Sequence, residues 1–71
     1  MMIKQGARVK TNAKFAEMIM DEVHLAKTLP WYGEVLKPFS RIPGCWGVKF
    51  DKIKYVQYIH ELYLDVLTHR S

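Results

Sequence analysis

The sequence has little of several residues and patterns that mark particular classes of protein. Cys45 is its single cysteine, which excludes an internal disulfide framework and leaves too few thiols for a cysteine-based zinc site. No apolar run approaches the roughly 18 residues that span a bilayer, and the N-terminal segment lacks the apolar core of a secretion signal. Glycine-rich phosphate loops, paired catalytic carboxylates and nucleophile elbows are also missing. We therefore expect a soluble, cytoplasmic protein that is not an enzyme, uses no cofactor and binds neither a membrane nor a small-molecule substrate.

The composition is that of a small folded protein with an uneven charge. With 49% hydrophobic and 25% charged residues, the 71-residue chain is typical of one domain covering 1–71. Residues 1–14 carry four basic residues and no acidic one, and residues 37–54 carry five against one. Residues 15–36 carry four acidic residues against one basic residue. This segregation, with a formal net charge of +4, predicts a basic face that attracts polyanions such as nucleic acid.

Alternating apolar and polar residues predict a series of short strands. They are expected at 7–11, 31–37, 45–51 and 54–60, with a 3₁₀ turn at 60–63, a last strand at 64–67 and a frayed tail at 68–71. The side chains expected to face inward are Val35 with Trp31 or Gly33, then Trp46, Val48 and Phe50, and finally Leu64 and Val66. In the segment 54–60, a slip of one residue exchanges the face of Val56 and Tyr58 for that of Ile59. We favour the register that turns Ile59 inward.

A helix is predicted between the first two strands. Apolar residues recur there at helical spacing, namely Phe15, Met18, Ile19, Val23 and Ala26, with charged residues on the other side. Thr11 or Asn12 can cap its N-terminus, and Pro30 limits its C-terminus. The sequence therefore predicts one helix near 13–27 in a mainly β fold.

The order of these elements resembles the small β-barrels of the Src-homology-3-like class, including the KOW-type barrels. The matching pieces are Gly6 with Val9, Gly33 with Val35, Val48 with Phe50 and Asp51, and Leu64 with Val66 and Leu67. The resemblance implies a barrel of about five strands with a helical insertion between the first two. The segment 58–64 is similar to the closing segment Y-I-P-x-x-Y-V of the peptide-binding branch, with His60 in place of the proline, but the acidic, aromatic-rich early loop of that branch is absent. Small basic chains of this kind also resemble bacteriophage accessory proteins, which implies a host cytoplasm.

Basic residues and one tyrosine form the first candidate site. If the strands at 45–51 and 54–60 pair as a hairpin, their lysines gather at its outer face and tip. Lysine and arginine neutralise phosphates, and exposed aromatic rings stack on unpaired bases. The residues expected to bind nucleic acid or a nucleoprotein complex are Arg8, Lys10, Lys37, Arg41, Lys49, Lys52, Lys54 and Tyr55. The alternative is a solvated barrel exterior, because edge lysines also prevent aggregation between strands.

The predicted helix supports a second function, which is binding to a protein. Met18 and Met20 make it apolar on more than one face, and methionine-rich surfaces adapt to partner proteins. The residues expected to bind such a partner are Met18, Met20, His24, Tyr58 and Tyr63. They suit a modulator or inhibitor that docks on a host protein, as a monomer or weak homodimer. The alternative is that the helix packs as a lid over one end of the barrel.

Two pairs of residues carry weaker chemical patterns. Cys45 and His60 can lie opposite each other on adjacent strands, as a thiol and its base do. Asp21 and His24 share one side of the predicted helix and resemble two metal ligands. A catalytic pair needs a third group that orients the base, and a metal site needs more than two ligands, so we expect neither site.

Overall fold

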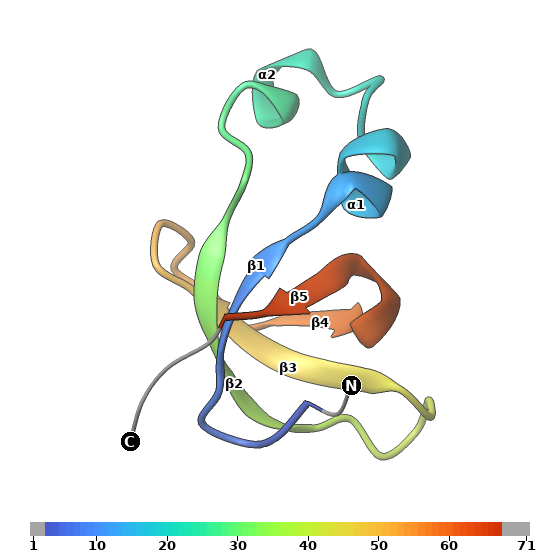
Figure 1. Ribbon diagram of the computed structural model, residues 1–71, viewed down its shortest axis with the longest axis vertical. Helices are drawn as coiled ribbons and strands as arrows, with labels where there is room; N and C mark the ends of the chain where they lie inside the picture. Colours follow the sequence, from blue (N-terminus) through green and yellow to red (C-terminus); the bar gives the residue numbers. More distant parts are fainter. Residues whose placement is uncertain (1–2, 68–71) are drawn as a thin grey trace.

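The computed structural model describes residues 3–67, so the tail predicted at 68–71 lies outside the described residues. The elements are β1 (Arg8–Thr11), α1 (Ala13–Met18), α2 (Val23–Ala26), β2 (Tyr32–Pro38), β3 (Cys45–Phe50), β4 (Gln57–His60), the 3₁₀ turn η1 (Glu61–Tyr63) and β5 (Leu64–Val66). Within residues 3–67, the strands form one 5-stranded antiparallel sheet in the order β4-β3-β2-β1-β5 (Figure 1). The prediction of a mainly β fold with helical structure between the first two strands is confirmed.

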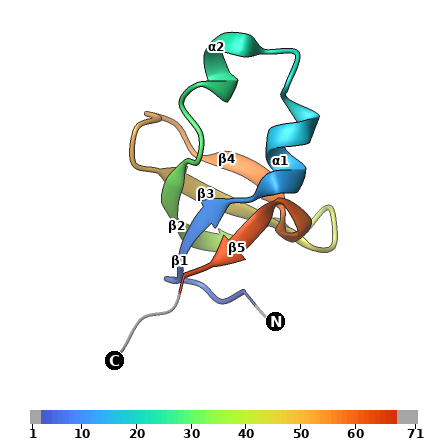
Figure 2. The same cartoon turned by 45° about the horizontal axis from the view of Figure 1, so that its top comes forward.

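The sheet is strongly curved around one core. Its two edges are β4 and β5, and side chains from both edges, Ile59 and Leu64, belong to the same buried cluster. In a flat sheet of this order, the two edges would lie about 19 Å apart. The sheet therefore curls until both edges reach the same core (Figures 1 and 2). No backbone ladder joins β4 to β5 within residues 3–67, so strand pairing there does not close the barrel that the resemblance implied.

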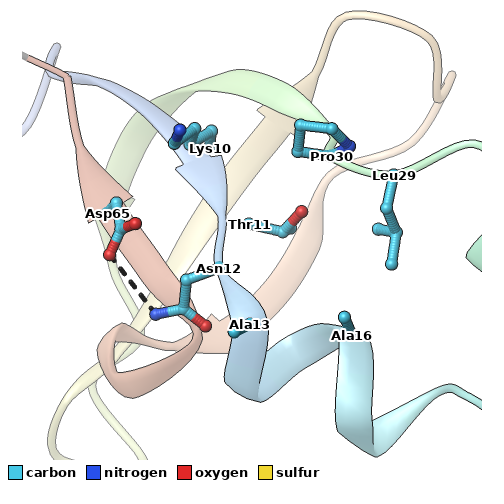
Figure 3. A pocket seen from close by; sticks show the side chains of 8 residues that line it. All are labelled: Lys10, Thr11, Asn12, Ala13, Ala16, Leu29, Pro30 and Asp65. Atoms are coloured by element: carbon cyan, nitrogen blue, oxygen red, sulfur yellow. Dashed lines mark hydrogen bonds between the residues drawn. The ribbon is translucent and has the colours of Figure 1, made fainter.

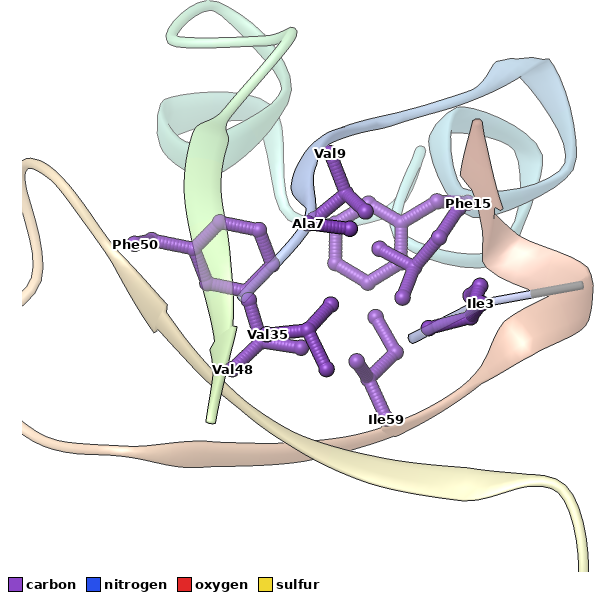
Figure 4. Close-up of a cluster of buried hydrophobic side chains, with 9 residues drawn as sticks. Ile3, Ala7, Val9, Phe15, Val35, Val48, Phe50 and Ile59 are labelled. Carbon is purple, nitrogen blue, oxygen red and sulfur yellow. The ribbon is translucent and has the colours of Figure 1, made fainter. Parts of the chain in front are cut away.

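The core lies where the alternation of the strands predicts it. The buried side chains are Ile3, Ala7, Val9, Phe15, Val35, Val48, Phe50, Ile59 and Leu64 (Figure 4). Trp46 and Val66, which were also predicted to face inward, are half-buried and pack against this cluster. Ile59 pairs across the strands with Trp46, and this pairing confirms the register that turns Ile59 inward.

Both alternatives for the second strand contribute to the interior. Gly33 lies buried in β2 and pairs with Phe50 of β3. Trp31 precedes β2 and packs edge-to-face on the ring of Phe50, with centroids 5.5 Å apart. Its ring also meets Phe15 of α1 edge-to-face at 5.2 Å. The aromatic rings of these three residues therefore connect α1 to the sheet.

The single helix predicted at 13–27 is wrong in its extent. α1 ends at Met18, and the chain turns through residues 19–22 before α2 begins at Val23. A straight helix over 13–27 would carry the chain about 22 Å away from the sheet. The chain must instead return to the sheet, because the N–H of Thr11 donates to the carbonyl of Trp31 at 3.0 Å. The break reverses the chain and permits this return, and we call residues 12–30 the helical arm.

Hydrogen bonds fix both ends of the helical arm to the sheet. Of the two predicted caps, Asn12 is the one used: its Oδ1 accepts the N–H of Phe15 at 3.2 Å. Its Nδ2 donates to the carbonyl of Leu62 at 2.9 Å. At the other end, the hydroxyl of buried Thr11 accepts the N–H of Trp31 at 3.0 Å. The arm is therefore anchored at its base, whereas α2 buries none of its residues.

Candidate nucleic-acid interface

The structure divides the predicted basic set between the two ends of β3. Lys52, Lys54 and Tyr55 are exposed in the turn that joins β3 to β4. Lys37 and Arg41 lie at the opposite end, in the last residues of β2 and in the loop that follows (Figure 1). The length of β3 separates the two groups by about 20 Å. They do not form one continuous contact, so the predicted surface consists of two separate parts.

Two tyrosines and three lysines lie at the turn end of the sheet. Tyr55 is 72% exposed and Tyr32 is 43% exposed. Lys10 is the cross-strand partner of Tyr32 in the β1–β2 ladder and of Asp65 in the β1–β5 ladder, although Lys10 and Asp65 form no ion pair within residues 3–67. Lys52 and Tyr32 line the same small cavity of about 110 Å³. We call this set the tip surface: Lys10, Tyr32, Lys52, Lys54 and Tyr55.

Arg8 and Asp51 form a bidentate ion pair beside the tip surface. The guanidinium of Arg8 donates to both carboxylate oxygens of Asp51, at 2.8 and 3.2 Å. This hydrogen bonding lowers the pKa of Asp51 below its ordinary value and raises the pKa of Arg8. Both side chains are largely exposed to water, so the pair adds little to stability. Its effect on the site is electrostatic, because Asp51 is the only acid in the turn 51–56 and Arg8 compensates its charge next to Lys52.

Lys49 faces outward from the sheet, as predicted, but it has close acidic and polar neighbours. Its Nζ donates to the carbonyl of Phe50 at 2.8 Å. Glu34 is its cross-strand partner in β2, and Glu34 is also the partner of Arg8 in β1. The outer face therefore carries a row of alternating charges across three strands. Opposite charges alternate along this row, so its net positive charge is smaller than that of the tip surface.

One tyrosine of the tip surface was missed by sequence reasoning. Tyr32 alternates with Gly33, and a strand that turns Gly33 inward must turn Tyr32 outward. The signal was present in the sequence, because Trp31, Gly33 and Val35 share one face of an alternating strand and Tyr32 lies on the other. The partner of Tyr32 in the site, Lys52, was predicted from the turn.

Cys45 and His60 lie opposite each other in the β3–β4 ladder, as the sequence suggested. The histidine is used elsewhere, because its Nδ1 accepts the N–H of Leu62 at 3.0 Å and so caps η1. Its ring also packs on Gly44, where the Cβ of any larger residue would lie 2.6 Å from Nε2. The imidazole is thus a helix cap that covers a glycine, and no hydrogen bond between it and the thiol is found in residues 3–67.

Asp21 and His24 are exposed on the helical arm, and Asp21 lies in the break between the two helices. Within residues 3–67, no group of three or more histidine, cysteine, aspartate or glutamate side chains is close enough to hold a metal ion. None of the helices in that part of the chain is both long enough and apolar enough to cross a membrane.

The residues predicted to bind a partner protein separate into two groups. Met18 and Met20 are 52% and 65% exposed on the helical arm, and His24 is exposed beside them. Val23 and Leu25 are also exposed there, although helical spacing had placed Val23 on the buried side. The break after Met18 explains this difference, because it removes α2 from the face that α1 turns to the core.

The two tyrosines of that set have structural contacts. The ring of Tyr58 lies 4.7 Å from that of Phe39 and next to Gly47, whose missing side chain leaves room for it. Tyr63 is half-buried and packs edge-to-face on Phe15 at 6.2 Å. Tyr58 covers the outer face of the sheet, and Tyr63 extends the aromatic core towards η1.

A further cavity of about 300 Å³ lies at the base of the helical arm (Figure 3). It is lined by Lys10, Thr11, Asn12, Ala13, Ala16, Leu29, Pro30 and Asp65. Two of its polar side chains already have partners in the chain: Thr11 accepts from Trp31, and Asn12 donates to Asp65 at 3.4 Å. We assign no ligand to this cavity.

Comparisons of the chain with models of protein families, with curated proteins and with solved structures found no match. The interpretation of the tip surface therefore depends on its own geometry and charge.

Proposed function

We propose that the protein is a non-enzymatic binding module that contacts single-stranded nucleic acid, free or in a nucleoprotein complex, through the tip surface. The observation that carries the proposal is the exposure of Tyr32 and Tyr55 at the end of the sheet that also carries Lys10, Lys52 and Lys54, three lysines that form no ion pair within residues 3–67. A tyrosine that is 72% exposed contributes little to a core, so packing does not explain Tyr55 in this turn.

The chemistry of the tip surface suits unpaired nucleotides. Each lysine that neutralises a phosphate releases a counterion, so three lysines predict a log-log salt slope of about −2 on a single strand. Stacking of one base on an exposed tyrosine contributes about 1–3 kcal/mol. A duplex hides its base faces, so stacking on Tyr32 and Tyr55 favours single strands.

The order of elements supports a place for the chain among the Src-homology-3-like small β-barrels of KOW type. Its support is the succession of antiparallel strands, the helical arm between β1 and β2, and η1 immediately before β5. Within this proposal, the protein acts in the cytoplasm as an accessory protein of the bacteriophage type.

A second candidate function is binding to a host protein through the helical arm. The observation that favours it is the exposure of four apolar side chains on one short stretch: Met18, Met20, Val23 and Leu25. The arm 12–30 also carries three acidic residues against two basic ones, so it differs in charge from the basic sheet. Affinity purification with and without nuclease distinguishes the two functions, because only a protein partner survives the nuclease.

The proposal is tested by the binding of a labelled oligothymidylate of about 12 nucleotides, followed by fluorescence anisotropy. The double variant Lys52→Glu/Lys54→Glu is expected to lose at least about tenfold in affinity and to lower the salt slope by about 1.4. Tyr55→Ala is expected to weaken binding by about 1–3 kcal/mol without changing the salt slope.

The matched control is Lys37→Glu/Arg41→Glu, which makes the same change of charge at the other end of β3. It is expected to keep most of the affinity, since only its long-range electrostatic effect remains. Equal losses in the two double variants would show that bulk charge alone attracts the oligonucleotide. That result, or no binding at low salt, would refute the tip surface.

A further inference from the structure

A groove of about 350 Å³ runs along the free edge of β4. Within residues 3–67, β4 pairs only with β3. All four of its residues, 57–60, line the groove. Successive side chains of a strand point to opposite faces of the sheet, so only a groove that follows the edge meets all four.

Three backbone groups of this edge are available for pairing. The N–H of Glu61 donates to the carbonyl of Gly44 at 2.8 Å, and hydrogen-bonded pairs alternate along an antiparallel ladder. Tyr58 and His60 therefore direct their N–H and C=O groups away from β3. Cys45, the partner of His60, agrees with this pattern, because its own N–H and C=O bond to the β2–β3 loop. The His60 carbonyl accepts the first hydrogen bond of η1, because His60 is the N-cap of that turn, so the groups left for pairing are the N–H and C=O of Tyr58 and the N–H of His60.

The opposite wall of the groove is apolar and uncharged. Apart from β4, its lining includes Phe15 and Met18 of α1, together with Trp31 and Tyr63. Phe15, Phe50 and Ile59, which also line it, belong to the buried core cluster (Figure 4). The lining includes no aspartate, glutamate, lysine or arginine. Such a lining offers a polyanion no lysine or arginine, whereas apolar side chains gain by burial.

We infer that this groove binds an extended, uncharged peptide segment of a partner protein, which adds to the sheet as a strand beside β4. Only an extended backbone can pair with the N–H and C=O of Tyr58 and with the N–H of His60 together, and its alternate side chains then enter the apolar groove. This inference goes beyond the proposed function, since the groove and the tip surface are separate sets of residues.

The experiment selects binders from a display library of random peptides about 10 residues long, the upper length of ordinary strands. Enriched peptides are expected to have apolar residues at alternate positions and no net charge. A selected peptide, made synthetically, is expected to slow the hydrogen exchange of the Tyr58 and His60 amides. N-methylation of the peptide on the paired side should abolish binding, and N-methylation one residue along should not.

Two variants of the protein separate the groove from the rest of the helical arm. Met18→Glu puts a charge into the groove wall and is expected to weaken the peptide by at least about tenfold. Met20→Glu changes an exposed methionine outside the groove and is expected to leave peptide binding unchanged. Both variants are expected to bind oligothymidylate like the wild type, so failure of the groove and failure of the tip surface give different results.

Three outcomes would overturn the inference. The first is that selection on the wild-type protein enriches no peptides beyond those enriched in a parallel selection on the Met18→Glu variant. The second is a peptide that binds without protecting the Tyr58 and His60 amides. The third is a dimer in which these amides are protected without peptide, because a second copy would then occupy the edge.

Discussion

Replacing Gly33 by alanine is expected to destabilise the sheet, although the change adds one methyl group. Gly33 is buried in β2, next to Phe50 of β3. A Cβ at this position would lie 2.6 Å from the carbonyl oxygen of Lys49 and 2.8 Å from the Cα of Phe50. Both atoms belong to the backbone of β3, which is held by ladders on both sides, so no side-chain rotation relieves the contact.

The size of the effect follows from these distances. Ordinary contacts between carbon atoms begin at about 3.5 Å, so β3 must move away by about 0.7 Å. Overpacking of this kind costs about 1–3 kcal/mol. The lower entropy of the unfolded chain with alanine offsets about 0.4–1 kcal/mol of that cost. We expect a net loss of about 1–2 kcal/mol in the free energy of unfolding, or a fall of about 5–15 °C in the melting temperature.

Urea unfolding followed by tryptophan fluorescence measures this loss, because Trp31 packs on Phe50. Gly47→Ala is the matched control, since its Cβ would meet only side-chain atoms of Tyr58 and Val56 within 3.3 Å, and these exposed side chains can move. The control is expected to lie within about 0.5 kcal/mol of the wild type. Equal stability of Gly33→Ala and Gly47→Ala would refute the reasoning from backbone contact.

Two further predictions concern polar side chains. Asn12→Ala removes both the cap of α1 and the bond to the Leu62 carbonyl, and is expected to cost about 1–2 kcal/mol in urea unfolding; Asn12→Asp keeps the cap and should lose less, so equal losses would contradict a capping role. The pKa of Asp51 is lower in the folded than in the unfolded state, so the stability that the pair with Arg8 contributes is present above the unfolded pKa of about 3.9 and is lost as the pH falls through the folded pKa. Asp51→Asn should therefore make the urea midpoint less sensitive to pH below about 4, and an unchanged pH profile would show that the pair does not form in solution.

The strands could be predicted because their residues alternate, and the arm could not be predicted in detail. The alternation of Trp46, Val48 and Phe50 predicts which face of β3 turns inward. In the structure Trp46 pairs with Ile59, so Ile59 lies on the inward face of β4. The helical period of 13–27 contains no information that the chain must return beside Thr11. The return is fixed by the hydrogen bond from the Thr11 N–H to the Trp31 carbonyl. This bond joins residues far apart in the chain, so no local pattern predicts it.

The candidate site was predictable in its residue types but not in its grouping. Lysines of the turn were recognisable from the hairpin pattern, and they remain together. Arg8 and Asp51 are 43 residues apart in the chain, so no local pattern reveals that they compensate each other's charge. Lys37 also belonged to the predicted surface, but the length of β3 carries it to the far end of the sheet.

The pairing of β1 with β5 has a consequence for how the protein is made. Val9 lies in the second strand from one edge and pairs with Val66, so residues from the two ends of the described segment meet in one ladder. During synthesis the chain emerges at about 5–20 residues per second, N-terminal part first. The hairpins of β2, β3 and β4 are local and can form early, whereas β1 lacks its second neighbour until Val66 has left the ribosome. Completion of this sheet therefore waits for β5, and β1 is the strand that must be protected from wrong pairing in the meantime.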